Sequence, residues 1–170
     1  MDRYEGFDEF VRSRGAALSR TAYLLCGSHA AAEDLLQEAL AKTAIRWPQV
    51  RDGHPEAYVR KVMTNQRTAW WRRLRGREKS FADPPDRAAT GVSEEQIAGR
   101  LALASALGTL SPKQRAVVVL RFYEDMSTED TANLLGVTTG TVKRHCHEAL
   151  ARLRRLLPAL ADEETMEVTG

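Results

Sequence analysis

Residues 128–157 read TEDTANLLGVTTGTVKRHCHEALARLRRLL, a pattern that predicts two helices meeting at a short turn. Ser127 is a suitable N-cap for the first helix, with Asp130 three positions later. Gly136 stands where a helix end favours a residue that can take positive φ, and Thr138 offers the next N-cap. A short helix, a glycine turn and a longer helix are the components of a helix-turn-helix.

The longer of these two helices has one apolar face and one polar, basic face. Its apolar residues keep the spacing of a buried face and are Val142, Cys146, Ala149, Leu150 and Leu153. The opposite face carries Gly140, Lys143, Arg144, His147 and Glu148. Such a face suits a recognition helix in the major groove of DNA, although an ordinary helical hairpin would simply place these charges in solvent.

Length and composition indicate a globular protein with room for one domain or two small ones. The chain has 170 residues, 28% charged and 43% hydrophobic, and a formal net charge of only +2. A nucleic-acid role must therefore depend on local basic patches. No apolar run approaches membrane-spanning length and the N-terminus has no signal-peptide core, so we expect a cytoplasmic protein without membrane insertion. Cys26 and Cys146 lie in apolar patterns, which favours buried thiols over a disulfide.

The sequence of the N-terminal half predicts helices separated by helix-ending residues. Apolar residues keep helical spacing over 7–25, and Gly27 ends that helix. A second helix is expected from Ser28 to about Arg46, with a break at Trp47-Pro48. One of its faces carries three neighbouring polar residues, Asp34, Gln37 and Glu38. By itself, such an acidic face is most simply a solvated one.

A third helix is expected from Pro55 onward, with faces of different polarity. The predicted core face comprises Tyr58, Val59, Val62, Met63, Ala69, Trp70 and Leu74. The opposite stripe comprises Lys61, Thr64, Asn65, Thr68, Trp71, Arg72 and Arg75. Cations that follow phosphates and a ring that stacks on a base suit single-stranded nucleic acid. Alternatively, Trp71 shares the core with Trp70 and the arginines are solvated.

Residues 80–93 interrupt the helical pattern. Pro84-Pro85 prevents a continuous helix, and residues Asp83 to Gly91 lack apolar anchors. Ser93 and Ser111 then each begin a helix, and the sequence shows no strand alternation, repeat or glycine-rich phosphate loop. We therefore predict an all-α protein of two small helical domains, 1–79 and 94–158, joined by a mobile linker, 80–93, and followed by a tail, 159–170.

Three segments resemble a known family. Residues 110–154, LSPKQRAVVVLRFYEDMSTEDTANLLGVTTGTVKRHCHEALARLR, resemble the fourth conserved region of bacterial sigma-70-type initiation factors. Residues 31–47, AAEDLLQEALAKTAIRW, and 57–73, AYVRKVMTNQRTAWWRR, resemble the second region. Because little lies between the two regions, the chain is similar to the small extracytoplasmic-function (ECF) class. The wording VVVLRFYEDMS is similar to an actinobacterial branch of that class.

The resemblance implies a factor that binds core RNA polymerase, directs it to promoter DNA and assists melting, without a cofactor. Its partners would be the β′ clamp helices, which Asp34, Gln37 and Glu38 would contact, and the β subunit. The melted −10 element would contact Arg51, Asp52, Gly53, His54, Lys61, Asn65, Trp71, Arg72 and Arg75. The duplex −35 element would contact Thr139, Thr141, Lys143, Arg144, His147 and Glu148. An anti-sigma factor is a common regulator in this class.

The recognition helix departs from many relatives at two places. They often have a TVKSR-type run where this chain has residues 141–145, and arginine where it has Glu148. Glu148 could pair with Arg144 at i, i+4 and orient it, or accept a hydrogen bond from cytosine. Readout is slightly favoured, because the order from arginine to glutamate is the weaker one on a helix.

Two other classes of protein fit the sequence less well. A stand-alone helix-turn-helix regulator would need a dimerising surface and palindromic sites, and it leaves the acidic face and the Trp71 stripe unexplained. An enzyme is disfavoured because no nucleophile and base are paired in the sequence. The run from His145 to His147 is not a metal site, since adjacent helical residues point in different directions.

Overall fold

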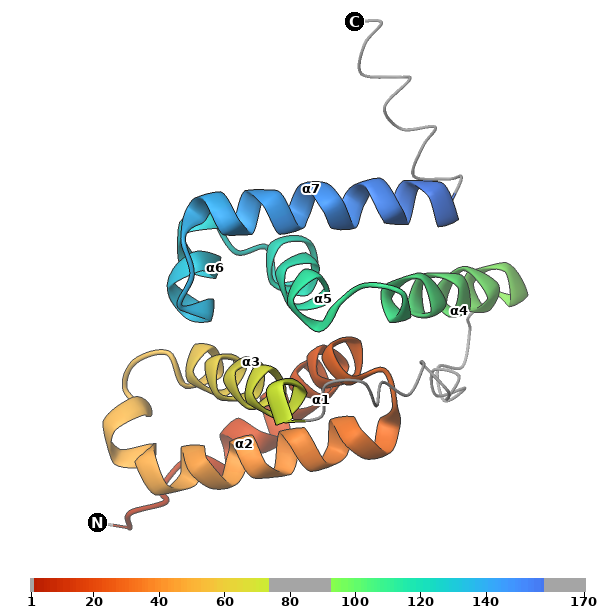
Figure 1. The fold of residues 1–170 in the computed structure, drawn as a ribbon. Coiled ribbons are helices and arrows are strands. Elements are labelled where there is room, and N and C mark those ends of the chain that lie inside the picture. The colour runs from red at the N-terminus through yellow and green to blue at the C-terminus, as the bar shows by residue number, and fades with distance from the viewer. Residues whose placement is uncertain (1, 74–92, 158–170) are drawn as a thin grey trace, which may run out of the picture.

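The computed structural model describes residues 2–73 and 93–157, with the side chains of 70–73 excepted. Every regular element in these ranges is helical, which confirms the all-α class (Figure 1). The N-terminal unit comprises α1 (Phe7–Cys26), α2 (His29–Val50) and α3 (Pro55–Arg73). The C-terminal unit comprises α4 (Glu94–Gly108), α5 (Pro112–Val118), the π-helical turn η1 (Val119–Tyr123), α6 (Thr128–Leu135) and α7 (Thr139–Leu156). No described helix has the length and apolar character needed to cross a bilayer.

The expected break at Trp47-Pro48 is wrong, because α2 continues through Pro48 to Val50. Trp47 anchors this last turn: it is 4% exposed, and its indole Nε1 donates to the carbonyl of Glu5 at 2.7 Å. Its ring also meets Phe7 edge-on, with centroids 5.2 Å apart. The amide of Arg51 still donates to the Trp47 carbonyl at 2.9 Å. Proline removes only one backbone donor, and the buried indole outweighs that loss.

The predicted helix-turn-helix is confirmed, caps included. The Ser127 hydroxyl accepts from the amide of Asp130 at 2.9 Å, and Gly136 has φ 66°. The Thr138 hydroxyl accepts from the amide of Thr141 at 3.2 Å and so begins α7. Of the predicted inner face of α7, Val142, Ala149 and Leu153 are buried, while Cys146 and Leu150 are half-buried.

The segment before the helix-turn-helix differs from the expected regular helix. The amide of Glu124 donates to the carbonyl of Val119 at 2.9 Å, five residues back, so η1 is wider than an α-helix. This change of pitch shifts the helical phase. The apolar side chain of Phe122 is 54% exposed, whereas that of Leu120 is fully buried.

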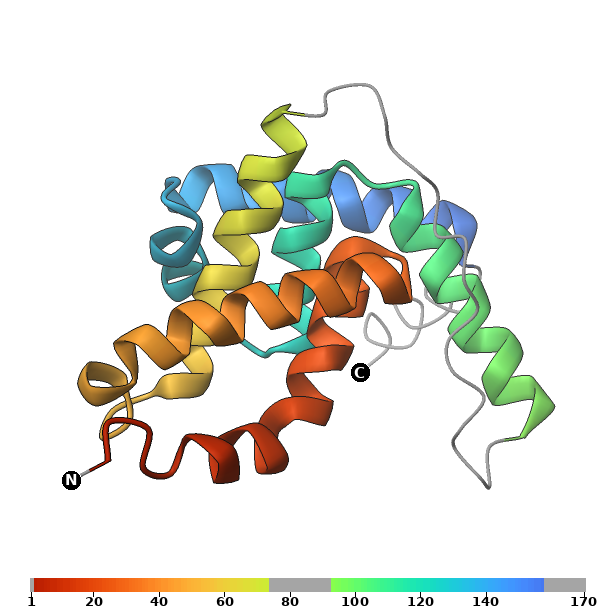
Figure 2. The ribbon, with the colours of Figure 1, turned by 90° about the horizontal axis from the view of Figure 1, so that it is seen from below.

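The two units lie against one another (Figures 1 and 2). Helices α5 and α6 pack on α3, and α5 and η1 pack on α1. Ala116 of α5 and Val119 of η1 belong to the same buried apolar cluster as Leu18 of α1 and Met63 of α3. The predicted mobility of the linker concerns residues that, except for Ser93, lie outside the described ranges, as does the tail.

Candidate protein and nucleic-acid interfaces

The acidic face of α2 is exposed, as its spacing predicted. Asp34, Gln37 and Glu38 all lie on the surface. The Gln37 amide donates to Glu33 at 3.2 Å, and Glu38 forms an ion pair with Lys42 at 2.9 Å, one helical turn further on. The surface is therefore acidic with a flanking cation, a pattern suited to a partner that carries basic side chains.

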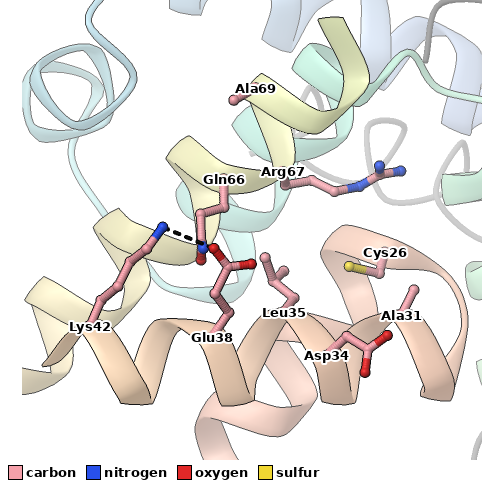
Figure 3. Close-up of a pocket in the computed structure, with 9 residues that line it drawn as sticks. All are labelled: Cys26, Ala31, Asp34, Leu35, Glu38, Lys42, Gln66, Arg67 and Ala69. Atoms are coloured by element: carbon pink, nitrogen blue, oxygen red, sulfur yellow. Dashed lines mark ion pairs between the residues drawn. The ribbon is translucent and has the colours of Figure 1, made fainter. Parts of the chain in front are cut away.

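A pocket of about 350 Å³ lies beside this face, between α2 and α3 (Figure 3). It is lined by Cys26, Ala31, Asp34, Leu35, Glu38, Lys42, Gln66, Arg67 and Ala69. Gln66 and Arg67 were not among the site residues predicted from the sequence. A signal was present, because Gln66 lies one turn after Val62, on the stripe of α3 predicted to be core. Both polar atoms of the Gln66 amide are buried without a hydrogen-bond partner among the described residues.

Cys26 lies at the end of the same pocket and is a free thiol. Burial raises its pKa to about 11, and the opposing effects of the nearby Arg67 and Arg115 charges are smaller. The thiol is therefore protonated at neutral pH. Cys146 is also free, and burial raises its pKa as well.

The candidate −10 residues fall into two exposed groups. In the loop after α2, Asp52, Gly53 and His54 are exposed, while Arg51 is half-buried with its guanidinium 3.7 Å from Asp52. On α3, Lys61 and Asn65 are exposed, as predicted. The side chains of Trp71 and Arg72, and all of Arg75, lie outside the described part of the chain, and so does the predicted contrast between Trp70 and Trp71.

The predicted faces of α3 need two corrections. Thr64, expected on the polar stripe, is 1% exposed, and its hydroxyl donates to the carbonyl of Arg60 at 2.8 Å. Arg60, which lies one turn before Thr64 and was not part of the predicted stripe, pairs with Glu124 of the C-terminal unit, so that unit covers this side of α3. Ala69, expected in the core, is exposed beside the pocket between α2 and α3.

The candidate −35 residues lie on the outer side of α7. Thr139, Lys143, Arg144, His147 and Glu148 are exposed, and Thr141 is half-buried beside Thr138, with the two hydroxyl oxygens 3.0 Å apart. Val142, fully buried, sets the rotation of the helix and directs Lys143 and Arg144 outward. This side of α7 is suited to a DNA groove.

Glu148 has partners that the sequence did not predict. Its carboxylate accepts from the Gln114 side-chain amide of α5 at 3.1 Å and lies 3.9 Å from His145 Nδ1. The described structure has no ion pair between Arg144 and Glu148, so the proposed i, i+4 pair is not formed. Partial burial lowers the pKa of His145, and the charge of Arg144 adds to this effect. Glu148 is therefore oriented toward α5.

The described residues contain no group of three or more His, Cys, Asp or Glu that could hold a metal ion. His145 and His147 leave α7 in different directions, since His145 is half-buried and His147 is exposed.

Two family profiles match the chain in order. "Sigma-70 region 2" matches residues 10–77, which include the acidic face and α3. "Sigma-70, region 4" matches residues 106–155, which include α5 to α7.

Individual proteins are similar over most of the chain. The RNA polymerase sigma-E factor of Streptomyces avermitilis is 49% identical over 152 residues, covering 89% of this chain and 84% of the relative. The ECF RNA polymerase sigma factor SigM of Mycobacterium tuberculosis is 35% identical and covers 92% of this chain and 79% of the relative. Among solved structures, the sigma factor RpoE of Bartonella quintana, in complex with the anti-sigma factor NepR, matches with TM-score 0.68 and 25% identity. That match covers 89% of this chain and 96% of RpoE.

Proposed function

The chain belongs to the sigma-70 family, in its ECF class, and on that premise we propose that it is a transcription initiation factor that binds core RNA polymerase and directs it to specific promoters. The observation that carries the proposal is the presence of both sigma regions, in order, in one chain that exposes an acidic face on α2 and a basic face on α7. We further propose the domain limits 1–79 and 94–158, with 80–93 as linker and 159–170 as tail.

The acidic face of α2 is the proposed contact with the β′ clamp helices. Asp34 and Glu38 supply carboxylates on adjacent turns, and Gln37 adds hydrogen-bonding capacity between them. An exposed acidic patch meeting basic residues gives orientation and a fast encounter. Polymerase supplies the catalysis, and this chain supplies promoter specificity. It would act where polymerase acts, in the cytoplasm.

The basic face of α7 is the proposed reader of duplex DNA at the −35 element. Lys143 and Arg144 are exposed near the start of α7, and Arg144 can contact guanine with two donors. Contacts to phosphate from Thr139 and Thr141 at the helix start would set the register. Glu148, held by Gln114, would stand beside the groove.

The proposed −10 contact combines the loop 51–54 with the outer side of α3. Removing a base from the stack costs a few kcal/mol, at order-of-magnitude precision. Stacking on a ring such as Trp71, at about 1–3 kcal/mol per base, and phosphate contacts from Lys61 and the arginines would offset that cost. Asn65 would supply hydrogen bonds to an exposed base edge.

The experiment that tests this proposal is reconstitution with core polymerase. The chain is expected to co-purify with core enzyme and to support transcription from a promoter that core enzyme alone does not use. Asp34→Lys and Glu38→Lys should each weaken core binding without changing helicity, because each reverses a charge that faces the basic clamp. Undiminished binding in both variants would contradict the assignment of this face.

The same experiment separates the alternative of a stand-alone helix-turn-helix regulator. Such a protein would bind palindromic duplex sites as a dimer and would not co-purify with core polymerase. Because RpoE of Bartonella quintana was solved with the anti-sigma factor NepR, an anti-sigma factor is also a proposed partner of this chain.

A further inference from the structure

One carboxylate joins the two units of the chain. Glu124 follows η1 in the C-terminal unit, and its side chain is only 10% exposed. One of its oxygens pairs with Arg60 Nε of α3 at 2.6 Å. The other accepts a hydrogen bond from the Thr21 hydroxyl of α1. Glu124 therefore connects two helices of the N-terminal unit to the turn that leads into the helix-turn-helix.

The backbone around Glu124 holds its side chain in this position. Its amide closes the π-helical turn by donating to the Val119 carbonyl. The next residue, Asp125, takes φ 52°, a conformation that aspartate adopts more readily than most residues. Arg121 then reaches across the turn and donates to the Met126 carbonyl. The carboxylate is thus presented by a turn of defined shape, and π-helical turns are frequent at functional sites.

Besides the buried apolar cluster that α1, α3, α5 and η1 share, the contact between the units includes further polar groups. Leu25, near the end of α1, offers its carbonyl to Arg115 Nη1 of the C-terminal unit at 3.4 Å and to Arg67 Nε of α3 at 3.1 Å. The end of a helix carries partial negative charge and lacks internal donors, which favours these cations. Arg20 Nε donates to the Tyr123 hydroxyl at 3.3 Å. Polar contacts of this kind suit an interface that opens and closes.

The closed arrangement is too short to span a promoter. Elements centred at −35 and −10 are about 25 base pairs apart, or about 85 Å of duplex at 3.4 Å per base pair. Here α3 packs on α6, which leads through a short turn into α7. The 18 residues of α7 extend only about 27 Å. The two DNA-reading helices cannot reach both elements while the units remain in contact.

We propose that Glu124, paired with Arg60 and Thr21, is a latch that keeps the free chain closed and must release before both promoter elements are bound. This inference rests on the proposed function, because only a factor that reads two separated elements needs to open. The latch lowers the fraction of chains able to bind, and the apparent affinity for polymerase and promoter falls by the same fraction. Release of the latch also removes one of the two carboxylate partners of Arg60, the neighbour of Lys61 on the helix proposed to read the −10 element.

The chain supplies a matched pair of variants for the test. Arg60 has two carboxylate partners, Glu124 across the interface and Glu56 at 2.5 Å within α3. Glu124→Gln and Glu56→Gln each remove one of these charges while keeping side-chain shape. Small-angle X-ray scattering of the full chain measures the radius of gyration and the open fraction. Circular dichroism confirms that each variant keeps its helicity.

The latch predicts a specific order of results. Glu124→Gln and Arg60→Gln should raise the open fraction about tenfold, the size of a typical coupling between contacting charges. Glu56→Gln should stay as compact as the unmodified chain. The charge swap Arg60→Glu with Glu124→Arg should be more compact than either single variant with one charge reversed. Equal radii for Glu124→Gln and Glu56→Gln, or a swap that restores no compactness, would overturn the latch.

Polymerase binding distinguishes failure of the latch from failure of the proposed function. If both hold, Glu124→Gln binds core polymerase more tightly than the unmodified chain, whereas Asp34→Lys binds less tightly at an unchanged radius. Loss of binding in Asp34→Lys with no gain in Glu124→Gln would contradict the latch while supporting the proposed polymerase-binding face. Equal binding by all these chains would contradict both the latch and the proposed polymerase-binding face.

Discussion

The two helices proposed to read DNA, α3 and α7, differ in how many of their sides are covered. Helix α7 packs mainly on α5 and α6, and its outer side leaves Lys143 and Arg144 exposed. Helix α3 packs on α1 and α2 and also on α5 and α6, so it buries both Met63 and Thr64. Less of its surface remains for DNA.

This difference teaches where polar residues serve packing rather than binding. A helix covered on one side can place its apolar residues inward and its polar residues outward. A helix covered on two sides meets a second surface, where hydroxyls and charges must find partners within the protein. Thr64 bonds to its own helix and Arg60 to the other unit, so neither is free for nucleic acid in the closed chain.

The largest expected effect is on the free energy of unfolding, and it compares core packing in α3 with core packing in α7. Met63 and Val142 are both fully buried, in α3 and α7 respectively. Met63→Ala should cost about 2–5 kcal/mol of unfolding free energy, because it leaves a cavity in the core where α3 packs on its neighbouring helices. Val142→Ala removes less volume, at about 0.8 kcal/mol per buried methylene plus a cavity cost, and should cost less. Urea unfolding of both variants measures this order, and a greater loss in Val142→Ala would reverse the comparison.

The next effect concerns base discrimination by the exposed side of α7. Arg144→Ala should lose about 1–3 kcal/mol of discrimination at one −35 position, because a side chain able to contact guanine with two donors is removed. Its stability should remain within about 0.5 kcal/mol, as for other exposed sites. Sequencing of bound pools from a randomised −35 element measures the preference. An unchanged preference would remove Arg144 from the reading face.

The pH dependence of stability reports how deeply each cysteine is buried, Cys26 in the N-terminal unit and Cys146 in the C-terminal unit. The pKa of Cys26 is raised to about 11 in the folded chain, so between pH 9 and 11 the unfolded chain holds fewer protons than the folded one. Stability must therefore fall as pH rises through this window, by about 1 kcal/mol at pH 10 for this thiol. The loss should be absent in Cys26→Ala when unfolding is compared at pH 8 and 10. Cys146→Ala should remove less of it, and an equal change would show that both thiols are equally buried.

The smallest effect concerns Glu148, whose carboxylate is held by Gln114. Glu148→Ala should leave the base preference unchanged and raise general DNA affinity slightly, because a negative charge near phosphates is removed. Gln114→Ala should leave the charge in place and free the carboxylate. Filter-binding titrations at two salt concentrations measure both. A lost preference at a single base position in Glu148→Ala would restore direct readout.

Much of the helix-turn-helix could be predicted because its signals are local. Ser127, Gly136 and Thr138 act on backbone groups within four residues, and the inner face of α7 follows one helical period. The exposure of the acidic face of α2 followed from the same periodicity. The roles proposed for these faces stay predictions.

The errors share a cause in contacts between distant segments. Pro48 remains helical because the Trp47 indole is anchored to the carbonyl of Glu5, 42 residues earlier in the chain. Glu148 turns to Gln114 of α5, 34 residues earlier in the chain, rather than to Arg144. None of these partners lies within one helical turn in the sequence.

The sequence alone therefore determined the helical class, the caps and the two outward faces, since spacing and capping act over a few residues. The tertiary structure decided which sides of α3 are covered, how far α2 extends and how the two units meet. These outcomes depend on partners such as Thr21 and Glu124, 103 residues apart, and local periodicity carries no information about which distant surface a helix will meet.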